Sequence, residues 1–152
     1  MTQRSVVHGS FHLERSYQAK PARVFKAFAD PDAKARWFAG PPDWPQRPRS
    51  MDFRVGGREI SAGGPAEGPI YTFSALYWDI VENERIVYSY EMLMDRTRIS
   101  VSLATLEFRP EGDGARLVLH EDGAFLDGHD TVAHRREGTE HLLEALAAAL
   151  AD

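Results

Sequence analysis

The sequence predicts an α+β domain whose curved antiparallel sheet has its concave face closed by a long C-terminal helix. Three observations lead to this prediction. A first strand is followed by two short helices, several strands with turn signals come next, and a long amphipathic helix ends the chain. The 152 residues suffice for one such domain, which we expect to span residues 1–152.

The N-terminal region is predicted to form one strand and two short helices. Apolar and polar residues alternate from residue 9 to residue 18, the pattern of a half-buried strand. Pro21 suits the first turn of a helix that ends near Asp30. Pro31 can open a second helix over residues 32–38, which places Trp37 and Phe38 at its end.

Residues 40–69 are predicted to be mostly loop with short strands. They contain 6 of the 12 glycines and 6 of the 9 prolines. Within them, segments 51–55 and 58–60 flank Gly56-Gly57, which predicts a hairpin with a two-residue turn.

Two pairs of longer strands are predicted to follow. The first pair covers residues 70–81 and 85–94, and the second covers residues 98–110 and 115–122, with a turn at 111–114. If the register is unbroken, an apolar strip faces outward, formed by Ile99, Val101 and Leu103. Such a strip favours a homodimer, although a bulge would return it to the interior.

The last helix begins after Asp130 or Thr131, either of which is a good N-cap. At 100° per residue, one arc of this helix collects Val132, Arg135, Thr139, Leu142, Leu143, Leu146 and Leu150.

Several classes of chemistry find no support in the sequence. The absence of cysteine excludes disulfides, thiolate metal sites and cysteine nucleophiles. The six histidines have no metal-ligand spacing, and no Gly-x-Ser-x-Gly motif is present. We therefore predict no metal, no cofactor and no assigned catalytic residue.

The charge pattern does not indicate a nucleic-acid partner. The net charge of −5 combines an N-terminal excess of basic residues with a C-terminal excess of acidic ones, which fits two solvated faces or a head-to-tail contact between subunits. No apolar run reaches the ~20 residues of a membrane span. The N-terminus lacks the pattern of a signal peptide, so we expect a cytoplasmic protein.

Five segments resemble a known family in their order along the chain. They are Lys20–Phe28 with Asp30-Pro31 and Trp37, Met51–Gly57, Glu84–Tyr90, Thr105–Phe108 and Glu121–Gly128. They resemble START-like (SRPBCC) proteins, and among these the single-domain relatives of the C-terminal domain of activators of the heat-shock-protein ATPase. The resemblance implies the helix-grip fold, a curved antiparallel β-sheet wrapped around a long C-terminal α-helix, with a cavity for hydrophobic small molecules. It implies chaperone stimulation only for proteins with an additional chaperone-binding domain.

One departure from the family pattern bears on the cavity. Where many relatives have Gly-Trp in the last helix, this chain has Gly138-Thr139. If the tryptophan fills the cavity in those relatives, the resemblance implies a larger cavity here, or one filled by another side chain.

The candidate cavity residues are mostly aromatic, which is also the composition of an ordinary core. We expect ligand-binding residues among Trp37, Phe38, Trp44, Phe53, Tyr71, Phe73, Tyr88, Tyr90, Met92, Glu121, Phe125, Arg135, Gly138 and Thr139. Trp44, in the proline-rich loop, is the candidate for the mouth.

Arg135 and Glu121 are the polar residues predicted to point inward. They are expected to pair with each other, to fix the polar end of a ligand, or to act in acid–base chemistry.

The leading hypothesis is a protein that binds a small apolar molecule between the sheet and the last helix. One alternative is an enzyme of the polyketide-cyclase or hydrolase kind that uses Glu121, His134 or a tyrosine. The other is a chaperone-type protein-interaction module. A filled core beside Gly138 and Thr139 would favour the interaction module, and a cavity there would favour the other two.

Overall fold

The computed structural model describes residues 3–151 and contains the predicted succession of elements. They are β1 (Val6–Tyr17), α1 (Pro21–Ala29), α2 (Pro31–Ala35), β2 (Arg49–Met51), β3 (Arg58–Gly63), β4 (Tyr71–Val81), β5 (Arg85–Met94), β6 (Thr97–Glu111), β7 (Gly114–Leu126) and α3 (Val132–Leu150). The strand and helix boundaries differ from the predicted ones by a few residues at most places. The α+β class predicted from the sequence is confirmed.

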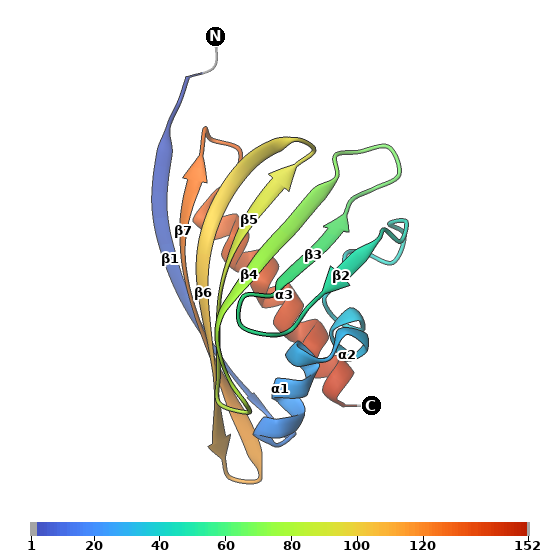
Figure 1. Ribbon diagram of the computed structural model, residues 1–152, viewed down its shortest axis with the longest axis vertical. Helices are drawn as coiled ribbons and strands as arrows, with labels where there is room; N and C mark the ends of the chain where they lie inside the picture. The colour runs from blue at the N-terminus through green and yellow to red at the C-terminus, as the bar shows by residue number, and fades with distance from the viewer. Residues whose placement is uncertain (1–2, 152) are drawn as a thin grey trace.

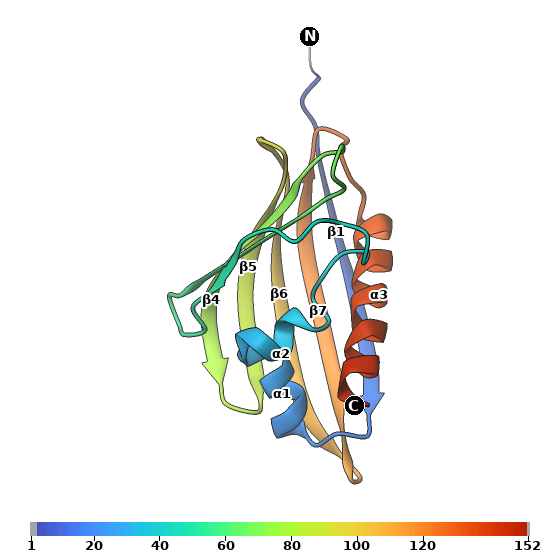
Figure 2. The same ribbon diagram turned by 90° about the vertical axis from the view of Figure 1, so that its right-hand side faces the viewer.

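All seven strands form one antiparallel sheet in the order β1-β7-β6-β5-β4-β3-β2 (Figure 1). Each strand from β2 to β7 pairs with its neighbour in the chain, whereas β1 pairs with the last strand. The sheet is curved and unclosed, and α3 lies along its concave side while α1 and α2 sit near one end (Figure 2). This is the helix-grip arrangement that the family resemblance implied.

The segment between α2 and β2 crosses the open side between the sheet and α3 (Figure 2). It includes Trp44 and has no regular secondary structure. Its position covers part of the space that the curved sheet leaves beside the helix.

Helix α3 is fixed at both its beginning and its middle. The Thr131 hydroxyl accepts a hydrogen bond from the backbone N–H of His134, which caps the helix as predicted. Further along, the Tyr17 hydroxyl donates to the backbone carbonyl of Leu143. The predicted inward arc is confirmed, because Arg135, Leu143 and Leu146 are buried.

Two bulges interrupt the strand register and bend the sheet. Trp78 is the extra residue of β4 opposite β5, and its indole lies on the outer face, where its N–H donates to the Ser89 hydroxyl. Ile99 is the extra residue of β6, because Leu93 pairs with Arg98 while Met92 pairs with Ser100.

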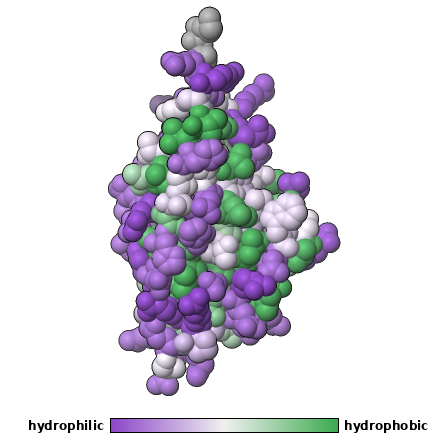
Figure 3. Space-filling model, turned by 90° about the vertical axis from the view of Figure 1, so that its left-hand side faces the viewer, coloured by the Kyte–Doolittle hydropathy of each residue, from purple (hydrophilic) through white to green (hydrophobic). Residues whose placement is uncertain are grey.

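The bulge at Ile99 corrects the expectation of an unbroken outward strip. Ile99 is only 2% exposed, whereas Val101 and Leu103 are 45% and 48% exposed on the outer face. The apolar strip therefore consists of two of its three predicted residues. On the β1 side of the molecule, apolar atoms lie in small patches among hydrophilic ones (Figure 3).

The two-residue turn predicted at Gly56-Gly57 is wrong. Strands β2 and β3 pair from Arg49 opposite Ser61 to Met51 opposite Glu59, so the connection covers residues 52–57. Gly56 has a positive φ of 84°, but a Cβ on Gly57 would lie 2.0 Å from the Asp52 carbonyl oxygen. Gly56 thus allows a backbone conformation with positive φ, and Gly57, which has no side chain, allows the Asp52 carbonyl to approach closely.

The second helix is shorter than predicted, ending at Ala35 instead of residue 38. Its N-cap is Asp30, whose carboxylate accepts a hydrogen bond from Ala33 N–H. After the helix, the Trp37 indole N–H donates to the Ala27 carbonyl of α1. This contact draws Trp37 into the core, where it is 4% exposed.

None of the helices in the described residues is long and apolar enough to cross a membrane.

Candidate functional site

A cavity of about 510 Å³ lies between the concave side of the sheet and α3. Strands β4, β5, β6 and β7 form one wall, α3 forms the opposite wall, and the region of α1 and α2 closes one end. Its lining is mostly apolar, with a few charged groups, which is the usual composition of a small-molecule site.

Twelve of the fourteen residues predicted from the sequence line this cavity. They are Trp37, Phe38, Trp44, Tyr71, Phe73, Tyr88, Tyr90, Met92, Glu121, Arg135, Gly138 and Thr139. The two others lie in the core behind it. Phe53 packs edge-on against Phe25 and Tyr77, and Phe125 lies beneath the Arg135 guanidinium, 5.3 Å from ring centroid to Cζ.

Four aromatic rings form a continuous wall along the sheet side. Phe73 lies 4.7 Å from Tyr90, 5.0 Å from Phe38 and 6.2 Å from Tyr88, measured between ring centroids. These offset and edge-to-face contacts hold the rings in fixed orientations. Two groups of buried charges contact this wall, one at Phe38 and Phe73 and the other at Tyr90.

The first group of charges is the Arg135 cluster, formed by Tyr90, Ser100, Glu121, Asp130 and Arg135. The Arg135 guanidinium donates from Nη1 to the Tyr90 hydroxyl (2.9 Å) and from Nη2 to Ser100 Oγ (2.8 Å) and Asp130 Oδ2 (3.1 Å). The Tyr90 hydroxyl in turn donates to Glu121 Oε2 at 2.8 Å. Arg135 and Glu121 are therefore bridged by the Tyr90 hydroxyl, whereas the first alternative from the sequence was a direct pair.

The Glu121 carboxyl is 3% exposed, and this burial raises its pKa above the ordinary value of 4.5. The hydrogen bond from Tyr90 and the charge of Arg135 favour the ionised form and oppose the effect of burial. Burial is the largest cause, so Glu121 holds its proton to higher pH than an exposed glutamate.

The Tyr88 hydroxyl, on a partly buried ring, differs from the phenol groups of the three buried tyrosines. Tyr17, Tyr77 and Tyr90 each donate a hydrogen bond to an oxygen of the protein. Tyr88 has no hydrogen-bond partner among residues 3–151, and its ring lines the cavity. Burial raises the pKa of Tyr88 well above its ordinary value, so the hydroxyl remains a donor.

The second group is the Lys34 cluster, formed by Lys34, Glu59 and Tyr77, which the sequence analysis did not identify. Lys34 Nζ lies 2.6 Å from Glu59 Oε1, which also accepts a hydrogen bond from the Tyr77 hydroxyl. Lys34 and Glu59 are 5% and 2% exposed, and Lys34 lines the cavity. Burial lowers the pKa of the Lys34 ammonium, and the nearby charge of Arg49 acts in the same direction, against Glu59.

Trp44 lies at the edge of the cavity in the segment that crosses its open side. A Cβ on Gly40 would lie 2.3 Å from the Trp44 ring, so glycine at this position lets the indole approach the backbone closely. Trp44 is half-buried and lines both this cavity and a neighbouring surface groove. This position is the one expected of a mouth residue.

The α3 wall has space beside Gly138. A Cβ built on Gly138 meets no atom within 4 Å, so the absent side chain is not required for close contact with the sheet. Thr139 turns its hydroxyl back to the Arg135 carbonyl at 2.9 Å. The cavity therefore extends to the place where the sequence lacks a large side chain.

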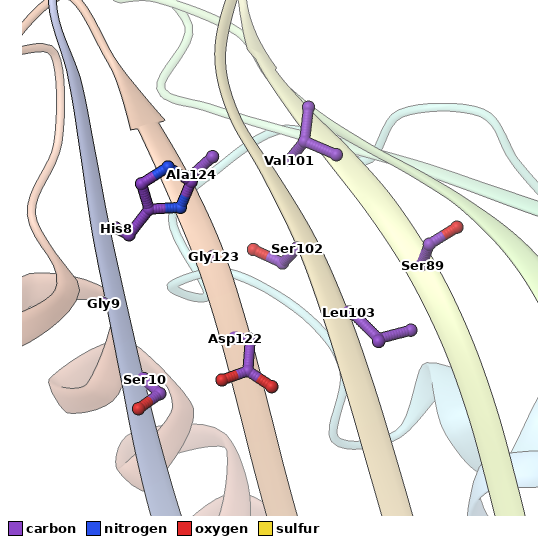
Figure 4. A pocket seen from close by; sticks show the side chains of 10 residues that line it. All are labelled: His8, Gly9, Ser10, Ser89, Val101, Ser102, Leu103, Asp122, Gly123 and Ala124. Carbon is purple, nitrogen blue, oxygen red and sulfur yellow. The ribbon is translucent and has the colours of Figure 1, made fainter.

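A second hollow, of about 530 Å³, lies on the outer face of the sheet across β1, β7, β6 and β5 (Figure 4). Its side chains come from neighbouring strands and stand around an open surface, with Val101 and Leu103 on one side and His8 and Asp122 on the other. It has no enclosing wall and no buried charged side chain, so the cavity beside α3 is the better candidate site. Within residues 3–151, no three His, Asp or Glu side chains are grouped so as to hold a metal ion.

Comparison with known proteins gives the same fold. The family described as "Activator of Hsp90 ATPase homolog 1-like protein" matches residues 18–151. An uncharacterised protein from Rhizobium leguminosarum is 41% identical over 98% of both chains, with a TM-score of 0.93. Protein Mll3558 from Rhizobium loti is 46% identical over 95% of this chain and 99% of that one, with a TM-score of 0.88.

A more distant structure, protein CV1439 from Chromobacterium violaceum, is 27% identical, covers 93% of this chain and 96% of that one, and has a TM-score of 0.75. No curated protein matches this chain.

Proposed function

The chain belongs to the Activator of Hsp90 ATPase homolog 1-like family, and from this membership and the cavity beside α3 we propose that it binds a small, largely apolar molecule. The observation that carries the proposal is the combination of an aromatic wall with open space at Gly138. Gly138 is exposed and lines the cavity, and no atom lies within 4 Å of its Cβ position, so nothing closes the cavity at this point of α3.

The walls indicate the shape and polarity of the ligand. Rings of Phe38, Phe73, Tyr88 and Tyr90 present faces and edges that favour a flat, aromatic or unsaturated body. The Arg135 guanidinium already donates hydrogen bonds to three protein oxygens. Its main role is therefore to fix the positions of the side chains that accept these bonds, and it has fewer N–H groups left for a ligand. The unpartnered Tyr88 hydroxyl is the group best placed to donate to one polar atom of the ligand.

Thermal unfolding with a graded series of apolar small molecules tests the proposal, with 2-naphthylmethanol as the reference probe. A ligand that binds only the folded state stabilises it by RT ln(1 + [L]/Kd), about 2.7 kcal/mol at a hundred times Kd. We expect Tm to rise with the concentration of the probe. Gly138→Leu, which fills the open space, should weaken that response.

Ala148→Leu is the matched control, because Ala148 lies on the exposed side of the same helix. It should retain the response of the unmodified protein. The proposal fails if no probe raises Tm, or if Gly138→Leu and Ala148→Leu respond alike.

The site also supports a second function, acid–base catalysis on the bound molecule. The observation that favours it is the buried Glu121 carboxyl at the cavity wall, whose pKa is raised by burial and whose Oε2 accepts a hydrogen bond from Tyr90. Turnover of a bound compound by the unmodified protein, abolished in Glu121→Gln while binding persists, would establish this function.

A further inference from the structure

The Lys34 cluster contains a buried amine at the wall of the cavity. The chain has 18 basic residues other than histidine, of which only Lys20, Lys26 and Lys34 are lysines. Lys20 and Lys26 are exposed, and Lys34 is 5% exposed. Arginine is the residue that usually serves buried ion pairs, whereas a buried lysine can lose its proton and act as a nucleophile.

The surroundings of the amine suit such a role. Nζ lies over the ring of Phe38, 4.6 Å from its centroid, and 5.7 Å from the centroid of Phe73. Both rings belong to the aromatic wall, so a flat ligand stacked there would bring its substituents close to the amine. Burial lowers the pKa of Lys34, which increases the neutral fraction of this amine relative to an exposed lysine.

A proton carrier is already in place beside the amine. Glu59 Oε1 accepts hydrogen bonds from both Lys34 Nζ and the Tyr77 hydroxyl. The carboxylate is 2% exposed, so bulk water competes little for this position.

From this geometry we propose that Lys34 forms an imine with an aldehyde or ketone ligand held against the aromatic wall. This inference rests on the proposed binding function and names the chemical class of its ligand.

Imine formation requires only the Lys34 amine, the carbonyl ligand and proton transfer by Glu59, and it releases one water molecule. The lone pair of neutral Nζ forms a bond to the carbonyl carbon, and the π electrons of the C=O bond move to its oxygen. Glu59 takes a proton from the nitrogen and returns it to that oxygen, giving a carbinolamine. The C–O bond then breaks, the second nitrogen proton leaves with the oxygen as water, and a C=N bond remains.

Reduction with sodium cyanoborohydride in the presence of 2-naphthaldehyde tests the inference, because the reagent converts an imine to a stable amine. Peptide mass mapping then identifies the modified lysine. At neutral pH we expect Lys34 to be the one lysine that carries a reduced adduct. The α-amino group, whose ordinary pKa is about 8, also reacts under these conditions and is counted separately in the peptide map. Lys20 and Lys26 are internal controls, which should react much more slowly than Lys34 at neutral pH and faster as the pH approaches about 10, the ordinary pKa of an exposed lysine.

Two variants separate the reaction from the stability of the fold. Lys34→Arg keeps a cation opposite Glu59 but cannot form an imine, and the double variant K34M/E59Q removes both charges of the pair. Both should lose the adduct while still unfolding in a single cooperative thermal transition, which shows that the fold is retained. In the unmodified protein, 2-naphthylmethanol, the matching alcohol that has no carbonyl group, reports binding without imine formation.

The outcomes distinguish the two proposals. Among the lysines, an adduct formed preferentially on Lys34 at neutral pH and lost in both variants supports the inference. Adducts distributed over the exposed lysines, or none on Lys34 while the alcohol still raises Tm, overturn the inference and leave ligand binding intact. Failure of the alcohol to raise Tm, together with no adduct on Lys34, overturns both.

Discussion

Tyr90 occupies the position between the two buried charges of the Arg135 cluster. Its hydroxyl accepts from Arg135 and donates to Glu121, so both residues depend on one oxygen. Removing that oxygen leaves two buried polar groups each short of a partner, which is costlier than the loss of an average hydrogen bond.

We therefore expect Tyr90→Phe to lower the free energy of unfolding by about 1–3 kcal/mol. Tyr88→Phe is the control, because it removes a neighbouring hydroxyl that has no hydrogen-bond partner within residues 3–151, and it should be nearly neutral. Urea unfolding of the two variants makes the comparison. Equal losses of stability would contradict the bridging role of Tyr90.

The raised pKa of Glu121 has a consequence for stability. The folded protein keeps the Glu121 proton at pH values where the unfolded chain has lost it, so this residue's contribution to stability falls as pH rises above 4.5. Glu121→Gln cannot ionise and escapes this loss. Relative to the unmodified protein, its free energy of unfolding should therefore increase between pH 4.5 and neutral pH.

Urea unfolding across this pH range measures the difference. Glu144→Gln, on the exposed side of α3, provides a control with the same chemical change. A Glu121→Gln protein that becomes less stable relative to the unmodified protein as pH rises would show that the ionised carboxylate is favoured in the fold.

At the scale of the secondary-structure elements, helix α3 contains a glycine at a position where neither the backbone conformation nor a close contact requires it. Gly138 lies in the middle of the helix, and a Cβ there would meet no atom within 4 Å. Gly138→Ala should raise the free energy of unfolding by about 0.5–1 kcal/mol, since alanine restricts the unfolded chain and adds no clash. Gly9→Ala is the opposite case, because its Cβ would lie 2.7 Å from Val132 Cβ, and it should destabilise the protein.

Thermal unfolding of both glycine variants is the measurement. A destabilising Gly138→Ala would mean that the space beside this residue is smaller in solution than in the structure.

The elements with strong local patterns were predictable from the sequence. Alternation in β1 and β5 and the helical arc of α3 identified which side chains face inward, so most cavity residues could be named in advance. The turn at Gly56-Gly57 was not predictable, because the role of Gly57 depends on a carbonyl oxygen brought close by the folded loop. The Lys34–Glu59 pair was missed for a similar reason, since it depends on where a five-residue helix docks on β3.

At the scale of the whole molecule, two basic residues of the N-terminal part of the chain form ion pairs with acidic residues of its C-terminal part. Arg4 pairs with Asp127 at 2.9 Å, and Arg15 lies 3.5 Å from Glu140. These exposed pairs contribute little energy. They nevertheless account for part of the charge asymmetry without requiring a contact between subunits.

The molecule is expected to open most easily along the segment that crosses the cavity. In residues 39–48, the one backbone N–H that bonds another backbone group is that of Trp44, which donates to the Pro41 carbonyl. Hydrogen exchange followed by mass spectrometry should therefore be fast in this segment and slowest in the long inner strands β4, β5, β6 and β7, which are paired on both sides. A bound ligand should slow exchange in residues 39–48, and equal exchange with and without ligand would argue against a covering role for Trp44.

The pairing of β1 with β7 also constrains how the protein is made. β1 is synthesised before the other strands of this sheet, but its hydrogen-bonding partner β7 is the last of these strands to be synthesised. At about 5–20 residues per second, the ~100 residues between them keep β1 unpaired for several seconds or more. The charged and histidine side chains along β1, such as His12, Glu14 and Arg15, discourage other chains from adding to it during that interval.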